Sequence, residues 1–169
     1  MSDITENTEV QGTIRVDQGI GVVRMQGRYD TDIDDLWSAL TVPDRLARWV
    51  ADVHGDLQLG GTFEATFTSG WEGPGTVQEC EPPRRLVLRM GSGADEGVIE
   101  ATLRSDGDAT VLTVEERGLP VPELHAHGAG WQAHMEDLAA HLAGQERGDW
   151  SARWAELDPE YLEQASKLR

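Results

Sequence analysis

Apolar and polar residues alternate with a period of two in several parts of the chain. In the segment 22–29, Val23, Met25 and Tyr29 share one face and three polar residues share the other. Six further strand-like segments follow between about residues 53 and 117. Such alternation is typical of antiparallel strands with one buried and one solvated face. The pattern therefore predicts an antiparallel sheet whose first strand is 22–29.

Two short helices are predicted directly after this strand. Thr31 is a candidate N-cap, and the acidic residues that follow it suit the first turn of a helix. Four apolar residues between positions 33 and 40 then recur at helical spacing. Pro43 ends this helix and begins a second one, which runs to Trp49.

A longer helix follows the last strand. Trp131, Met135, Leu138 and Leu142 are spaced by four, three and four residues, which places them on one helix face, and Gly144 is a candidate C-terminal cap. A lone helix after a run of strands must bury its apolar face on their sheet. The sequence therefore predicts an α+β fold, and this architecture commonly leaves a cavity between sheet and helix.

The ends of the chain are expected to lie outside the main domain, which we place at residues 13–144. Residues 1–12 are polar and acidic and are expected to be flexible. Residues 145–169 form a helical appendage in which Trp150, Trp154 and Leu157 recur at helical spacing, and Pro159 is expected to restart a short helix. This apolar stripe is too small to fold alone, so it packs on its own domain or, as the alternative, forms a homodimer.

Charge narrows the range of partners. The chain carries 31 acidic and 14 basic residues, for a net charge of −17. Such a protein repels nucleic-acid phosphates and anionic membrane surfaces, so we expect neither as a partner. Cys80 is the only cysteine, which excludes an internal disulfide and a cysteine metal cluster. The N-terminal residues do not show the basic region and apolar run of a signal peptide, and the sequence has no apolar run long enough to span a membrane. We therefore expect a cytoplasmic protein.

The histidines do not predict a metal site or any other cofactor. His127, His134 and His141 are seven residues apart, which separates them by about 10 Å along a helix axis. One ion with bonds of about 2.1 Å cannot span that distance. His125 and His127 form a His-x-His pair that could chelate an ion, but the sequence shows no carboxylate partner for it. His134 neighbours the apolar face of the long helix and is the best candidate for a polar group that points into a cavity.

Two further side chains are candidates for special roles. Glu79 has the same strand parity as Val77, so it is predicted to point inward as a buried carboxylate that could act as an acid or base. Trp71 lies on a turn rich in Gly and Pro, where a core residue is less expected, so it is a candidate gate or partner contact.

Several short strings resemble the activator of Hsp90 ATPase homologue-like (AHSA1-like) family of the START/Bet v 1 (SRPBCC) superfamily. They are Ile33–Thr41, Leu46–Trp49, Leu59–Phe63, Glu81–Leu86 and the pair Gly130-Trp131 that opens the last helix. The resemblance covers about residues 20–143. It implies a helix-grip fold, in which a curved antiparallel sheet wraps around a long C-terminal helix, with two short helices after the first strand.

The resemblance also implies a cavity, since relatives in the wider superfamily bind lipids, sterols or aromatic polyketides. The first hypothesis is therefore a protein that binds a small hydrophobic or aromatic molecule. One alternative is a polyketide cyclase-like enzyme that uses His134 or Glu79 as acid or base, and another is a chaperone-activator-like interaction module. The candidate cavity residues are Trp49, Phe63, Phe67, Trp71, Glu79, Leu88, Met90, Trp131, His134, Met135 and Leu138.

Overall fold

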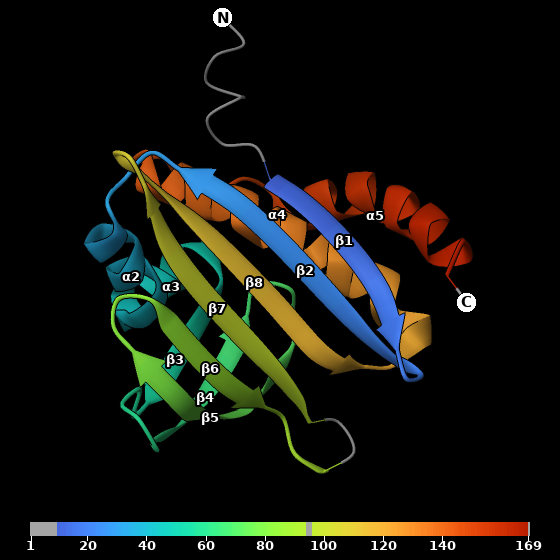
Figure 1. Ribbon diagram of the computed structural model, residues 1–169, viewed down its shortest axis with the longest axis horizontal. Helices are drawn as coiled ribbons and strands as arrows, with labels where there is room; N and C mark the ends of the chain where they lie inside the picture. The colour runs from blue at the N-terminus through green and yellow to red at the C-terminus, as the bar shows by residue number, and fades with distance from the viewer. Residues whose placement is uncertain (1–9, 94–95, 169) are drawn as a thin grey trace, which may run out of the picture.

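A single antiparallel sheet of eight strands forms the framework of the protein (Figure 1). The computed structural model describes residues 10–93 and 96–168. Its strands are β1 (Val10–Asp17), β2 (Ile20–Tyr29), β3 (Ala51–Gly55), β4 (Thr62–Phe67), β5 (Glu72–Glu81), β6 (Arg85–Met90), β7 (Gly97–Asp106) and β8 (Ala109–Leu119). They lie in the order β1-β2-β8-β7-β6-β5-β4-β3.

The helices lie on the inner face and along one edge of this curved sheet. They are α2 (Ile33–Thr41), α3 (Pro43–Trp49), the short 3₁₀ helix η2 (Val121–Glu123), α4 (Leu124–Leu142) and α5 (Trp150–Ser166). In Figure 1, α4 runs behind β1, β2 and β8, while α5 lies alongside α4 beyond the β1 edge. The α+β helix-grip fold is therefore confirmed. No described helix is long and apolar enough to cross a membrane.

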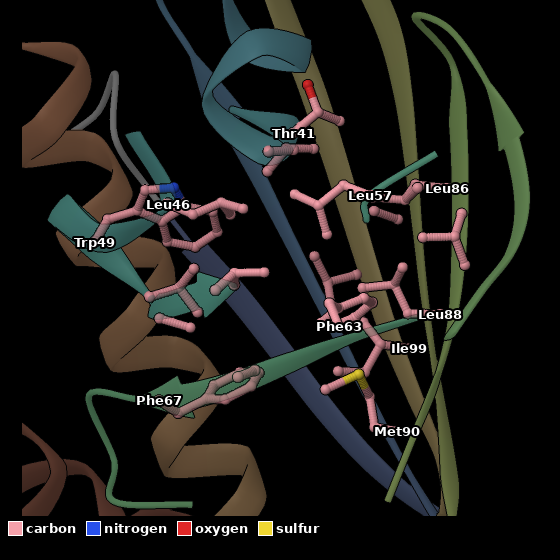
Figure 2. Close-up of a pocket in the computed structure, with 18 of the residues that line it drawn as sticks. Thr41, Leu46, Trp49, Leu57, Phe63, Phe67, Leu86, Leu88, Met90 and Ile99 are labelled. Atoms are coloured by element: carbon pink, nitrogen blue, oxygen red, sulfur yellow. The ribbon is translucent and has the colours of Figure 1, made fainter. Parts of the chain in front are cut away.

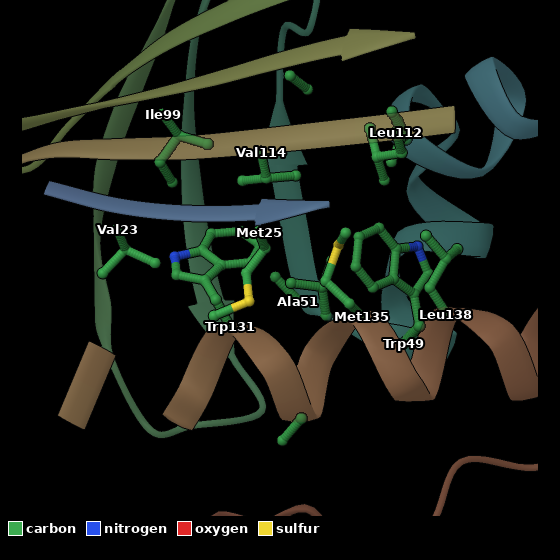
Figure 3. Close-up of a cluster of buried hydrophobic side chains, with 14 of the residues drawn as sticks. Val23, Met25, Trp49, Ala51, Ile99, Leu112, Val114, Trp131, Met135 and Leu138 are labelled. Atoms are coloured by element: carbon green, nitrogen blue, oxygen red, sulfur yellow. The ribbon is translucent and has the colours of Figure 1, made fainter. Parts of the chain in front are cut away.

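The core lies between α4 and the β1–β2–β8 side of the sheet. Met135 and Leu138 are fully buried, and Figure 3 shows Trp131 and Met135 directed at Met25 of β2. The Tyr29 hydroxyl donates a hydrogen bond of 2.9 Å to the carbonyl of Met135, which ties the same strand to the helix. The predicted apolar face of the long helix is thus the face that the sheet covers.

The first strand of the sheet is β1, so the sequence-based order began one strand too late and the two short helices follow β2. Residues 10–12, expected to belong to a flexible tail, form the start of β1, while residues 1–9 lie outside the described residues. Gly12 has no side chain to signal an inner face, because the Tyr161 hydroxyl of α5 occupies the space where its Cβ would lie. Val10, Ile14 and Val16 nevertheless alternate with polar residues, so the period-two signal of β1 is interrupted only at Gly12.

The C-terminal segment is part of the domain. Leu157 and Tyr161 are each only 3% exposed, and the Tyr161 hydroxyl donates to Gln132 Oε1 of α4 at 2.7 Å. Pro159 lies inside one continuous α5 and does not restart a helix. Proline removes the amide donor to the carbonyl four residues earlier, and here both Pro159 and Ala155 are exposed, so water can hydrate that carbonyl.

Two helix starts also differ from expectation. The α2 N-cap is Asp32 and not Thr31, because Asp32 Oδ1 accepts the Asp35 amide at 2.8 Å. The long helix α4 begins at Leu124, six residues before Gly130, since η2 leads directly into it. Gly128 in this first part allows the close approach of α5: a Cβ at Gly128 would lie 2.7 Å from Cδ1 of Tyr161.

We predict that removing the α5 contact destabilises the whole domain. Leu157→Ala should lower the free energy of unfolding by about 2–4 kcal/mol, because it leaves a cavity between α5 and α4. Leu162→Ala, at a position 46% exposed on the same helix, is the matched control and should change it by less than about 0.5 kcal/mol. Urea unfolding followed by circular dichroism measures both, and equal effects would show that α5 is not part of the cooperative unit.

Candidate functional site

A small apolar cavity lies between α2–α3 and the β4–β8 part of the sheet. Its volume is about 90 Å³, and Thr41 carries the only hydroxyl in its described lining. Figure 2 shows Leu57, Phe63 and Leu88 converging on this space. The other labelled lining residues are Leu46, Trp49, Phe67, Leu86, Met90 and Ile99. Ligand pockets usually measure about 300–1,000 Å³, so this inner cavity is too small to hold such a ligand alone.

A larger, open cleft adjoins the inner cavity. It measures about 620 Å³ and lies between the ends of β7 and β8, the loop 68–71, the first half of α4 and the start of α5. Four residues line both spaces: Phe67, Met90, Ile99 and Trp131. They form the partition between the inner cavity and the outer cleft. The outer cleft has the volume of a small-molecule site.

The structure distributes the predicted cavity residues over three places. Three line only the inner cavity: Trp49, Phe63 and Leu88. Phe67, Met90 and Trp131 lie on the partition, and Trp71 and His134 line only the outer cleft. Met135 and Leu138 line neither space, since they are fully buried against the sheet. Helical spacing places these two residues inward, but it does not show whether a strand covers them.

Glu79 points away from both spaces, which corrects its predicted inward orientation. A β-bulge causes the difference: Val77 pairs with Leu88 and Glu79 pairs with Val87, so Gln78 has no partner in the β5–β6 register. The extra residue inverts the parity beyond it. The Glu79 carboxylate therefore lies on the outer face of the sheet, where it pairs with the Arg85 guanidinium.

A largely buried carboxylate does face the outer cleft, and it belongs to Glu116 of β8. Its side chain is only 14% exposed. The Trp131 indole donates to Glu116 Oε1 at 2.8 Å, and His127 Nδ1 lies 3.1 Å from the same oxygen. Sequence reasoning missed Glu116, although Leu112 and Val114 precede it with the same parity on the inner face. That alternation was the available signal.

Two carboxylates act on His127 and raise its pKa. Burial lowers its pKa, but the hydrogen bond and charge of Glu116, together with Glu123, have the greater combined effect and raise it above the usual value. Glu123 Oε1 lies 3.9 Å from His127 Nε2. His127 therefore retains its proton to higher pH than an isolated histidine and donates it to Glu116.

His134 is a neutral, aromatic wall of the outer cleft. It is 3% exposed, and its ring centre lies 5.4 Å from that of Trp131, 5.3 Å from that of Trp150 and 6.0 Å from that of Phe67. Burial, reinforced by the charge of Arg147, lowers its pKa to about 3, against an opposing backbone hydrogen bond with Trp49. Such an imidazole takes up protons poorly near neutral pH, which argues against His134 as a general base.

Asp137 lies one turn further along α4 and is also buried. Burial raises its pKa to about 6, and the opposing backbone hydrogen bond, from the Gly148 amide to Oδ1, is 3.3 Å long. Within the described part of the chain, Asp137 Oδ2, His134 Nδ1 and Trp150 Nε1 are buried without a hydrogen-bond partner. The junction of α4 and α5 therefore contains polar groups whose charged forms are disfavoured.

The residues described by the structure contain no group of three His, Cys, Asp or Glu side chains suited to a metal ion. The His-x-His pair is divided between two partners. His125 Nδ1 lies 2.7 Å from Asp158 of α5, whereas His127 binds Glu116 of β8. The two imidazoles are thus each held by a different carboxylate.

Comparison with known proteins identifies relatives of this cleft-bearing fold. The family model described as Activator of Hsp90 ATPase homolog 1-like protein matches residues 30–143, whereas no curated protein matches the chain.

CalU16 from Micromonospora echinospora is similar with a TM-score of 0.75 and 27% identity, over 94% of this chain and 98% of CalU16. DynU16, of the dynemicin biosynthetic locus, has a TM-score of 0.69 and 30% identity, over 76% of this chain and 50% of DynU16. PFC0360w, an Hsp90 activator from Plasmodium falciparum, shares the fold at 19% identity, with a TM-score of 0.61 over 73% of this chain and 96% of PFC0360w.

Acidification should affect stability through His134 and Asp137 in opposite directions. His134 stays neutral when folded, with its pKa near 3, whereas an unfolded histidine is protonated below about pH 6.5. Lowering the pH from 7 to 5 therefore favours unfolding by about 2 kcal/mol through this group. Asp137, with a folded pKa of about 6, takes up its proton first in the folded state and favours folding by on the order of 1 kcal/mol over the same range.

Two variants separate these effects. Relative to the wild-type protein, His134→Phe should gain stability between pH 7 and pH 5, and Asp137→Asn should lose it. Urea titrations at the two pH values measure each difference. If both variants keep the wild-type pH dependence, the two buried groups titrate normally and the interpretation of the α4–α5 junction is wrong.

Proposed function

The chain belongs to the Activator of Hsp90 ATPase homolog 1-like family, and from this membership we propose that it binds a small apolar or aromatic molecule in the outer cleft. The observation that carries the proposal is the cleft of about 620 Å³ that five aromatic side chains line: Phe67, Trp71, Trp131, Trp150 and Trp154. The family and fold support small-molecule binding in general terms, and the lining supports an aromatic ligand.

Aromatic rings on several sides favour a flat, apolar ligand. Offset or edge-to-face ring pairs contribute about 0.5–1.5 kcal/mol beyond the burial of apolar area. Phe67 and Trp71 come from the β4 end and the loop 68–71, whereas Trp150 and Trp154 come from α5. A ligand between these two walls would be contacted on both faces.

The partition provides a way to extend the site. Phe67 and Met90 line both the outer cleft and the inner cavity. Methionine side chains are flexible and adapt to irregular shapes, so movement of Met90 can join the two spaces. The proposed ligand would then place its most apolar part toward Phe63 and Leu88 in the inner cavity.

The relative DynU16 supports a role with small molecules, because it belongs to a biosynthetic locus. The match covers 50% of DynU16, so it supports the class of function and not a particular ligand.

A second candidate function is proton transfer on an aromatic, polyketide-like substrate. The observation that favours it is the Glu116–His127 hydrogen bond at the wall of the outer cleft. An imidazole held by a carboxylate within reach of a ligand is a common acid–base arrangement. Glu116 and His127 take the place of the earlier candidates, since Glu79 faces outward and His134 remains neutral.

We predict that filling the outer cleft weakens ligand binding. Wild-type protein should bind the neutral probe 1-naphthalenemethanol with a Kd below about 1 mM in isothermal titration calorimetry. Ala126→Phe, which places a ring in the cleft, should weaken binding at least about tenfold by occupying the space of the ligand.

The matched control is Ala155→Phe, an exposed position on α5 outside the cleft, which should bind like the wild-type protein. Thermal unfolding of each variant shows that it is folded at the temperature of the titration. If the probe binds saturably and Ala126→Phe does not weaken that binding, the ligand lies outside the cleft. If the wild-type protein shows no saturable binding, the proposed function is contradicted.

A further inference from the structure

We propose that the outer cleft selects ligands that carry an ammonium group on an aromatic body, with the carboxylate of Glu116 as the partner of the cation. This inference rests on the proposed function, since it specifies the chemistry of the molecule that the cleft binds. Three independent observations support it: the charges of the lining, the free oxygen of Glu116 and the four indole rings that line the cleft.

The charges that line the outer cleft favour a cation. Among the described lining residues, Glu116 and Glu123 are carboxylates and none is Lys or Arg. Of the two lining histidines, His134 stays neutral because its pKa is lowered to about 3. Glu116, Glu123 and His127 therefore sum to a charge of −1 when His127 is protonated and to −2 when it is neutral. An anionic ligand would therefore meet an unfavourable field in either state.

The remaining charge near the cleft does not reverse this balance. Arg147 acts on His134 through its charge, but its guanidinium donates to the Ala47 carbonyl at 3.2 Å and it is not a lining residue. The whole chain carries a net charge of −17, which attracts cations to its surface over long range. The local and the overall electrostatic fields thus have the same sign.

Glu116 is held in place with one oxygen available. Its Oε1 accepts from the Trp131 indole and pairs with His127, which fixes the orientation of the carboxylate. Its Oε2 makes no hydrogen bond to any residue in the ranges 10–93 and 96–168. A carboxylate that is 14% exposed and already oriented can accept a charge-assisted hydrogen bond from an ammonium group with little reorganisation.

The indole rings provide the third observation. Trp71, Trp131, Trp150 and Trp154 all line the cleft that contains Glu116. The negative face of an indole attracts a cation within about 6 Å, and tryptophan is the strongest of the aromatic side chains in this respect. The same rings bind the apolar body of the ligand, so one lining serves both halves of an aromatic amine.

Three probes of one size test the inference. They are 1-naphthylmethylamine, 1-naphthalenemethanol and 1-naphthoate, which are cationic, neutral and anionic at neutral pH. Isothermal titration calorimetry at low salt should give an affinity for the amine at least about tenfold higher than for the carboxylate and several-fold higher than for the alcohol, because only the amine pairs with Glu116.

Glu116→Gln tests the residue, since the amide keeps an acceptor for Trp131 and removes the charge. It should reduce the preference for the amine over the alcohol at least about fivefold. Glu115→Gln, the neighbouring residue on the outer face of β8, removes the same charge from the protein and should leave that preference unchanged. Circular dichroism confirms that each variant is folded.

The outcomes distinguish the inference from the proposed function. If the alcohol binds but the amine binds no tighter, or if Glu115→Gln matches Glu116→Gln, the cation preference is wrong and the aromatic site remains. If none of the three probes binds, the proposed function fails and the inference fails with it. The probe series in the wild-type protein decides the question even if Glu116→Gln does not fold.

Discussion

One helix cannot cover an eight-stranded sheet, and most of this structure follows from that mismatch. Eight strands about 4.8 Å apart span on the order of 34 Å, whereas a helix with its side chains is about 10 Å wide. Here α4 packs on β1 and β2. The β4–β7 side is covered less completely, by α2, α3 and the loop 68–71, and the inner cavity and the outer cleft are the space that remains.

The same mismatch explains why polar groups can lie on the inner face. Glu116 continues the inward parity of Leu112 and Val114, but at a level of the sheet that borders the cleft. A buried carboxylate is tolerated when it is paired, and here the indole of Trp131 and the imidazole of His127 provide the partners. The cleft is therefore apolar over most of its surface and acidic at one point, which is the combination that our two proposals use.

Local patterns predicted most of the elements, and the misplaced face of Glu79 has a physical cause. Alternation located β2 and the inner faces of β4, β6 and β7, and the spacing from Trp131 to Leu142 located the buried face of α4. The strand β1 was missed although Val10, Ile14 and Val16 alternate with polar residues, with Gly12 as the only interruption. Glu79 was placed on the wrong face because a bulge at Gln78 inverts the parity of β5. A bulge is not visible in a period-two count.

The sequence by itself determined the α+β class, the buried faces of β2, β4, β6, β7 and α4, the acidic charge and the family. These depend on residues a few positions apart, whose relation the backbone geometry sets. Only the tertiary structure decided which inward residues line a space and which are covered, since Trp49 lines the inner cavity whereas Met135 is covered by the sheet. It also decided that Glu116 meets His127 and that Trp150 meets His134. Each of these contacts joins separate elements, so it depends on how they pack and not on the local pattern of either one.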